Sequence, residues 1–312
     1  MAYLKGRFYW NKRTREDLTK SIELFQLAVA KDPSYAPAYV GLSDAYVVLM
    51  GNAFLSPERA YPLAEAAASK ALDLDDSSAE AHTSLANVQF FHYKWAEAEK
   101  EFRRALALNP NYATAHHWYA LFLSALGRHT EAIEHTRRAQ ELDPLSLIIT
   151  ANAGWCYYLA GRYDLTIEQS RRALDLDPNF GFAYVYMSQA LVEKGMAKEA
   201  VAALLKAQAL SGGDADYQAE LANAYAALGQ KREALRILAE LLALSERETV
   251  SAYDVAMIYA GLGDSDKALS WLEKSYANRE PRLVNVKAHP RFAALHSDPR
   301  FAELLRRIGL AP

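Results

Sequence analysis

Cysteine, surplus basic charge and long apolar runs are all scarce in this sequence of 312 residues. Cys156 is the single cysteine, so no disulfide can form within the chain, and its apolar neighbours predict a buried, unreactive thiol. The formal net charge of −3 argues against direct nucleic-acid binding, which needs a basic stripe. No apolar run is long enough to span a bilayer, and no signal peptide begins the chain, so we expect no membrane insertion.

Catalytic and metal-binding motifs are missing as well. The sequence has no glycine-rich phosphate loop, no nucleophile elbow and no histidine-glutamate metal motif. His82 and His116 occupy equivalent positions of neighbouring segments, but no cysteine or carboxylate stands at a ligand spacing beside them. We therefore expect no enzymatic activity, no cofactor and no metal ion.

The sequence does contain a period of 34 residues. Six equivalent stretches begin at Ala79, Ala113, Leu147, Gly181, Ala215 and Thr249. Their twentieth position carries a small residue each time: Ala98, Ala132, Thr166, Ala200, Ala234 and Ala268. Prolines recur at Pro110, Pro144 and Pro178, where one helix must end before the next begins. Small residues at fixed positions allow paired helices to approach closely.

This pattern resembles the tetratricopeptide repeat, a helix-turn-helix unit. The resemblance implies an all-α fold, a right-handed superhelix of about eight helical pairs with repeats starting near residues 1, 36, 79, 113, 147, 181, 215 and 249. We expect the array to cover residues 1–281 and a capping segment to cover residues 282–312, in which Pro290 and Pro299 each start a short helix.

Short motifs at the two ends suggest a narrower relationship. Residues 4–10 (LKGRFYW), residues 32–42 (DPSYAPAYVGL), and the pair His289–Phe292 and Asp298–Phe301 resemble the tetratricopeptide regions of bacterial multidomain signalling and transcriptional regulators. In those proteins the repeats follow a DNA-binding, cyclase or kinase domain. The resemblance implies a sensory or regulatory role beside such an output domain.

In repeat arrays of this type the first helix of each pair lines the concave surface. The side chains that we expect there, as a groove for a peptide, are Asn87, His117, Trp118, Asn152, Trp155, Phe182, Tyr186, Gln189, Glu220, Asn223 and Tyr253. Asparagine and glutamine can bind an extended backbone through one donor and one acceptor, and the rings can receive apolar or cationic side chains. From the second repeat onward no lysine or arginine occupies these positions, whereas the acids include Glu80, Asp216, Glu220 and Asp254. The expected partner is therefore a neutral-to-basic peptide or protein segment. Packing inside the repeats is the alternative role for each ring.

Aromatic residues also crowd the first helix. Phe8, Tyr9 and Trp10 form a second predicted surface, which would meet an upstream domain or a second copy of the chain; alternatively, the rings fold inward onto Ile22, Phe25 and Val29. A homo-oligomeric assembly scaffold is accordingly the alternative to a peptide-binding module, and a substrate-presenting arm of an enzyme is the third hypothesis.

We expect a cytoplasmic location, or a periplasmic one if the parent protein has a spanning helix.

Overall fold

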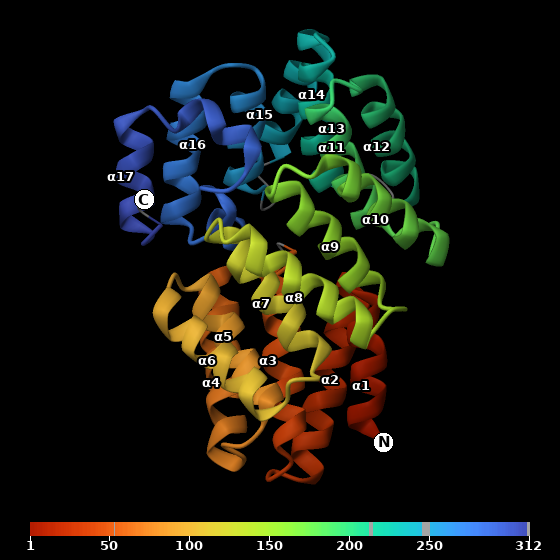
Figure 1. Cartoon of the computed structure of the whole chain (residues 1–312), viewed down its shortest axis with the longest axis vertical. Helices are drawn as coiled ribbons and strands as arrows, with labels where there is room; N and C mark the ends of the chain where they lie inside the picture. The colour runs from red at the N-terminus through yellow and green to blue at the C-terminus, as the bar shows by residue number, and fades with distance from the viewer. Residues whose placement is uncertain (53, 212–214, 245–249, 311–312) are drawn as a thin grey trace. The chain divides into compact units, whose positions relative to one another are not determined.

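The computed structural model describes residues 1–52, 54–211, 215–244 and 250–310, with the side chains of 211, 215 and 216 excluded. Every element in these ranges is helical, so the all-α prediction is confirmed (Figure 1). The helices of the first half are α1 (Ala2–Lys12), α2 (Arg15–Lys31), α3 (Ala36–Gly51), α4 (Pro57–Leu74), α5 (Ala79–Phe91), α6 (Trp95–Leu108), α7 (Ala113–Ala125) and α8 (His129–Leu142). Those that follow are α9 (Leu147–Leu159), α10 (Tyr163–Leu176), α11 (Gly181–Glu193), α12 (Ala197–Ser211), α13 (Ala215–Ala227), α14 (Lys231–Leu244), α15 (Ala252–Gly261), α16 (Ser265–Ala277), the 3-10 helices η1 (Pro281–Asn285) and η2 (Pro290–Leu295), and α17 (Pro299–Arg307).

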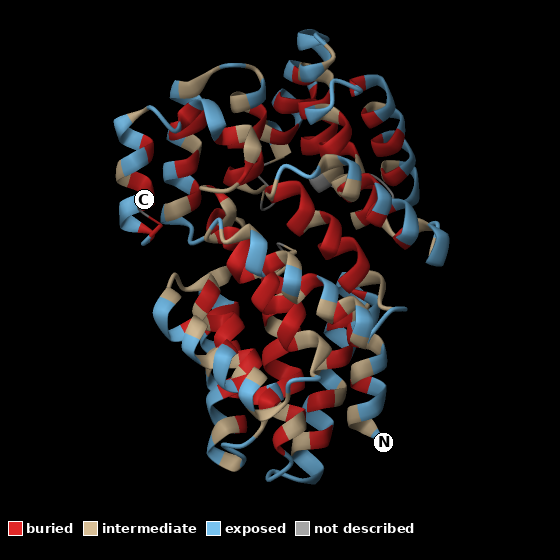
Figure 2. Ribbon diagram, in the orientation of Figure 1, coloured by how far each residue is buried: buried red, intermediate tan, exposed pale blue. Residues whose placement is uncertain are grey.

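The two helices of a pair differ in how they are buried. First helices such as α3 and α9 are buried on nearly every side, whereas second helices such as α6 and α10 are buried along one stripe only (Figure 2). The sequence explains the difference, because α9 is mostly apolar on all sides while α10 repeats small or apolar residues every three or four positions. First helices therefore lie between neighbours, and second helices form an outer layer.

Glycines set the turn inside the five pairs from α7–α8 to α15–α16. Gly127, Gly161, Gly195, Gly229 and Gly263 recur every 34 residues and all have φ between 70° and 81°. This left-handed conformation ends the first helix and costs glycine little, because glycine has no Cβ. In the pair α5–α6 the equivalent residue is Tyr93, with φ 60°.

The turns between pairs have a different chemistry. Asp32, Asp75, Asn109 and Asp177 each follow a second helix, and the side-chain oxygen of each accepts a hydrogen bond from the backbone N–H two residues later, at 2.9–3.0 Å. Such Asx turns give the backbone a local alternative to the helix. A helix start follows within a few residues each time, so the sequence alone fixes where the chain reverses.

Two compact units divide the chain, residues 1–119 and residues 120–312. In unit 1 successive first helices, α1, α3 and α5, contact one another, as do α9, α11, α13 and α15 in unit 2. We call the surface that these first helices form in a unit its inner face. The sequence-based division into residues 1–281 and 282–312 remains a prediction, and the expected repeat start at Thr249 lies outside the described residues.

Candidate functional site: the inner faces of the two units

A polar network joins three first helices of unit 1. Arg7 of α1 donates from Nη1 to Asp44 Oδ2 of α3 at 3.1 Å, and Ser84 Oγ of α5 donates to Asp44 Oδ1 at 2.5 Å. Asp44 is only 1% exposed. Burial raises the pKa of its carboxyl, while Arg7 and Ser84 favour the ionised form. Both carboxylate oxygens are thus occupied by side chains of unit 1 itself.

Beside this network an indole lies between two guanidinium groups. The Cζ atoms of Arg7 and Arg13 lie 4.2 Å and 3.6 Å from the ring centroid of Trp10, and Trp118 of α7 meets Trp10 edge to face at 6.5 Å. Both indoles are buried. His117 is buried next to Trp118, and burial, with Arg13 nearby, lowers its pKa to about 3. The inner face of unit 1 therefore carries cationic and aromatic groups with a neutral imidazole.

In unit 2 the inner face is covered by the C-terminal strap, as we call residues 281–296. His289 of the strap is 1% exposed and lies among three aromatic rings of α9 and α15, with ring centroids 5.6 Å from Trp155, 5.5 Å from Tyr158 and 6.2 Å from Tyr253. Burial, with Arg291 and Arg282 nearby, holds its pKa well below the usual value. The strap thus reaches from α15 back to α9, and it places a neutral imidazole among aromatic rings.

Two arginines of the strap face acids of the inner face. Arg282 Nη1 donates to Asp254 Oδ1 at 2.7 Å and to Oδ2 at 2.8 Å. Burial would lower the pKa of Arg291, but the Glu220 carboxylate and neighbouring acidic groups raise it overall. Glu220 also accepts a hydrogen bond from Gln189 Nε2 at 2.6 Å. Two acidic side chains predicted for the groove therefore already have partners in the same chain, Arg282 for Asp254 and Gln189 for Glu220.

Several polar atoms of the strap and of the side chains beneath it are buried without a hydrogen-bond partner among the described residues. They are Gln189 Oε1, Asn223 Oδ1 and Nδ2, Tyr253 Oη, His289 Nε2, and Arg291 Nε and Nη2. Buried polar atoms of folded proteins are normally satisfied. The polar contacts between the strap and the rest of unit 2 thus leave these atoms unpaired, whereas the ring contacts are close.

The predicted groove residues fall into two groups. Trp155, Phe182 and Tyr186 are partly exposed and lie together, with Tyr186 5.4 Å from Trp155 and 6.4 Å from Phe182 between ring centroids, and Tyr186 Oη donates to Asn152 Oδ1 at 3.1 Å. The other predicted residues, Asn87, His117, Trp118, Asn152, Gln189, Glu220, Asn223 and Tyr253, are each exposed by 9% or less. Peptide binding there stays a prediction, and the side chain of Asp216 lies outside the described residues.

Sequence reasoning missed the arginines of both inner faces. Arg7 and Arg13 precede the second repeat, from which the groove was read, and Arg282 and Arg291 belong to the segment interpreted as a cap. One signal was present: Arg7, Trp10 and Arg13 are three residues apart and so share one helix face. Nothing local in the sequence brings Arg282 or Arg291 to the inner face.

The second predicted surface is divided. Phe8 is 60% exposed and Tyr9 is partly exposed, whereas Trp10 is 3% exposed and packs inside unit 1. Trp10 is therefore a buried residue of unit 1 and does not form part of the predicted assembly surface. Tyr3 instead packs inward, 5.9 Å from Phe25 between ring centroids.

Within the described ranges, no helix is long and apolar enough to cross a bilayer. The same residues contain no group of three or more histidine, cysteine, aspartate or glutamate side chains arranged to hold a metal ion.

Comparisons with solved structures identify shared architecture. PilW, a widely conserved type IV pilus biogenesis factor, is 23% identical with a TM-score of 0.54, over 69% of this chain and 97% of PilW. A human IFIT1 dimer with PPP-AAAA is 17% identical with a TM-score of 0.62, over 85% of this chain and 69% of IFIT1. A tetratricopeptide repeat protein from Parabacteroides merdae is 13% identical with a TM-score of 0.58, over 87% of this chain and 98% of that protein. At such identities the likeness shows the fold alone.

Family profiles identify the family of the chain, which the likeness to solved structures does not. A tetratricopeptide repeat profile matches residues 251–279, and the profile described as regulator of microtubule dynamics protein 1-3 matches residues 94–252, more than half of the chain. A comparison with curated protein sequences finds no match. The chain is a tetratricopeptide-repeat protein-interaction module, and it belongs to the family described as regulator of microtubule dynamics protein 1-3.

Proposed function

We propose that this chain is a non-catalytic module that holds an extended, neutral-to-basic protein segment on the inner face of unit 2. The observation that carries the proposal is the strap. Its Arg282 binds the Asp254 carboxylate through two hydrogen bonds, and its His289 lies among Trp155, Tyr158 and Tyr253. A partner segment that combines arginine with a flat ring would meet the same chemistry.

The strap is then the internal competitor of this partner. Buried polar atoms of Gln189, Asn223, Tyr253 and Arg291 have no hydrogen-bond partner among the described residues while the strap is in place. Release of the strap would let water bind these atoms, and this gain offsets part of the cost of exposing the rings. Because an intramolecular competitor acts at an effective concentration of roughly millimolar or more, external segments bind detectably only when the strap is weakened or when they bind tightly.

A labelled peptide with the sequence of residues 280–298 tests the proposal. We expect the full chain with Arg282→Ser and His289→Ser to bind this peptide at least roughly tenfold more tightly than the wild type, as measured by fluorescence anisotropy. A scrambled peptide serves as one control. The variant Arg300→Ser is the other, because Arg300 lies in an exposed pair with Asp298 outside the strap. Equal affinity for both peptides in the strap variant would reject the proposal.

The physiological partner is a separate proposal. The description of the family names microtubule dynamics, so microtubules and the proteins bound to them are the first candidates, and co-sedimentation of the full chain with polymerised tubulin is the direct test.

A role beside a bacterial output domain has only the short end motifs as support. A cytoplasmic location likewise stays a proposal, which cell fractionation tests.

Exposed apolar side chains on α1 support one alternative, an assembly scaffold. Leu4 is 65% exposed and Phe8 is 60% exposed, one helical turn apart. If this side of α1 joins two copies, Phe8→Glu converts a dimer into a folded monomer in light-scattering chromatography. A monomeric wild type would exclude the scaffold.

A further inference from the structure

Arg13 is a buried cation that forms no salt bridge with the described residues. It follows α1 in a left-handed conformation, with φ 64°, and only 7% of the residue is exposed. Among the described residues no carboxylate oxygen forms a salt bridge with its guanidinium within 4.0 Å. Asp44, the acid that most influences its charge, already accepts hydrogen bonds from Arg7 and Ser84. A fold that buries a guanidinium normally pairs it.

Two donors of this cluster lack acceptors. Arg13 Nε and Trp10 Nε1 are both buried and have no hydrogen-bond partner among the described residues. They belong to one stack, since Arg13 Cζ lies 3.6 Å from the Trp10 ring centroid. The stacking is a favourable cation–π contact, but it does not satisfy the N–H groups and recovers only part of the cost of desolvation.

The surroundings also favour a negative charge. Arg7 lies on Trp10 with its Cζ 4.2 Å from the ring centroid, so a second guanidinium is close. His117 is buried and neutral at physiological pH, and Trp118 closes one side of the stack. The acid in the cluster, Asp44, is held by Arg7. An anion at Arg13 would therefore meet two arginines and two indoles.

We propose that the inner face of unit 1 binds a small oxyanion, a carboxylate or phosphate group, on Arg13 and Trp10. A guanidinium donates two parallel hydrogen bonds to either group, and the indole N–H supplies a third donor. The left-handed backbone at Arg13 is that of the turn inside a pair, where later pairs carry glycine, so the turn fixes where Arg13 stands after α1. This site is independent of the peptide site proposed for unit 2.

Calorimetric titration of the full chain with inorganic phosphate and, separately, with succinate tests the proposal, at constant ionic strength set with sodium chloride. We expect millimolar or tighter binding of at least one anion. Arg13→Met should abolish it, and Arg13→Lys, which keeps the charge but not the fork, should weaken it roughly tenfold. Arg103→Met, at a side chain 66% exposed, should bind like the wild type.

The response to the two anions identifies the source. Binding of phosphate alone indicates a phosphorylated ligand, and binding of succinate indicates an acidic side chain or chain terminus. Thermal unfolding gives a second readout, because a bound anion raises the melting temperature of the wild type but not of Arg13→Met. If Arg13→Met does not fold, Arg13→Lys decides. Binding of neither anion, or unchanged binding in the Arg13 variants, overturns the proposal.

Discussion

The imidazole of His289 lies 5.6 Å from the indole of Trp155, ring centroid to ring centroid, although the two residues come from the C-terminal strap and from α9. Tyr158 and Tyr253 complete the surroundings of the imidazole. The strap is therefore part of the core of unit 2, and side chains that the repeat pattern assigns to a groove become packing residues of the chain itself. Four expected outcomes follow from this and related contacts.

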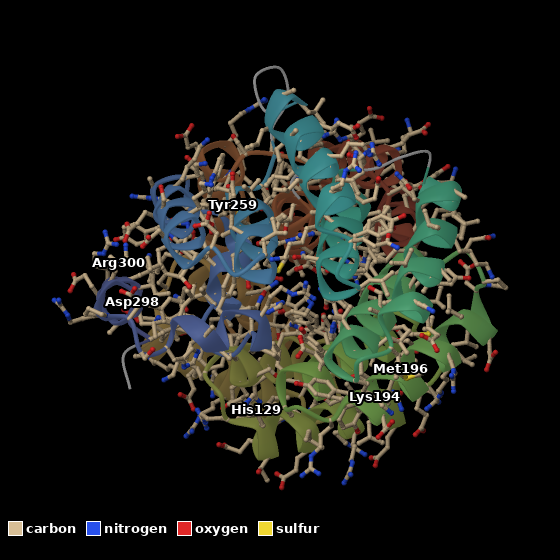
Figure 3. The ribbon with its side chains drawn as sticks, turned by 90° about the horizontal axis from the view of Figure 1, so that it is seen from above. His129, Lys194, Met196, Tyr259, Asp298 and Arg300 are labelled. Carbon is tan, nitrogen blue, oxygen red and sulfur yellow. The ribbon has the colours of Figure 1, made fainter. Side chains whose placement is uncertain are left out.

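Arg282→Met should destabilise unit 2. The change removes two hydrogen bonds from the Asp254 carboxylate, which is 3% exposed. Loss of one partner from a buried ion pair costs about 3–5 kcal/mol, and because the Arg282 side chain is 32% exposed we expect about 2–3 kcal/mol in urea unfolding. Arg300→Met is the control, since Arg300 of α17 lies at the surface (Figure 3) in pairs with Asp266 and Asp298, and surface pairs contribute about 0–1 kcal/mol. An equally small effect for both variants would contradict a structural role of the strap.

Gly6→Ala and Gly41→Ala should each destabilise unit 1. An added Cβ at Gly6 or Gly41 would stand 2.5 Å or 2.6 Å from Phe25 Cε1, and Phe25 is fully buried. Overpacking of this kind costs about 1–3 kcal/mol. Gly51→Ala is the matched control, because no described atom lies within 4 Å of its added Cβ. We expect Phe25→Leu to recover part of the loss in Gly41→Ala, and thermal unfolding of the four variants measures these effects.

Glu280→Ala should loosen the start of α15. The Glu280 carboxylate accepts hydrogen bonds from the backbone N–H groups of Ala252 at 2.8 Å and Tyr253 at 2.9 Å, and from the hydroxyls of Ser251 and Ser275. A carboxylate at a helix N-terminus satisfies free donors and complements the helix dipole, so we expect a loss of about 1–2 kcal/mol. Hydrogen exchange at Ala252 and Tyr253 should rise first, while Glu273→Ala on α16 leaves these amides protected.

Acid should destabilise the protein through buried histidines. His289 and His117 have pKa values below the ordinary 6.5 in the folded chain, about 3 for His117, because burial disfavours their charged forms. The unfolded chain therefore binds more protons as pH falls below 6.5, and each group lowers the free energy of unfolding by up to about 1.4 kcal/mol per pH unit until its folded pKa is reached.

Substitution separates this contribution from that of the carboxyl groups. His289→Gln should flatten the loss of stability between pH 6.5 and 5 relative to the wild type. Urea unfolding at several pH values measures both slopes. The same slope in His289→Gln and in the wild type would show that His289 is not held neutral.

Helix positions could be predicted almost residue by residue, because the determinants are local. Small residues at the helix contacts, glycines such as Gly161 at left-handed turns and Asx turns such as that of Asp177 each specify one feature within a few residues. The helices predicted from Ala79, Ala113, Leu147 and Gly181 begin at those residues. The candidate site was less predictable, because the 34-residue period identifies which side of a helix a residue occupies and not which side chains lie opposite it.

The sequence by itself thus determined the all-α repeat, the helix pairs and the two short helices that start at Pro290 and Pro299. Only the tertiary structure decided what meets the inner faces: Trp118 against Trp10 in unit 1, and Arg282 and His289 of the strap in unit 2. The physical reason is the separation in sequence between the residues that make each contact. Turns and helix packing within a repeat depend on neighbours in sequence, whereas a buried arginine or histidine depends on groups that the chain brings together from distant repeats.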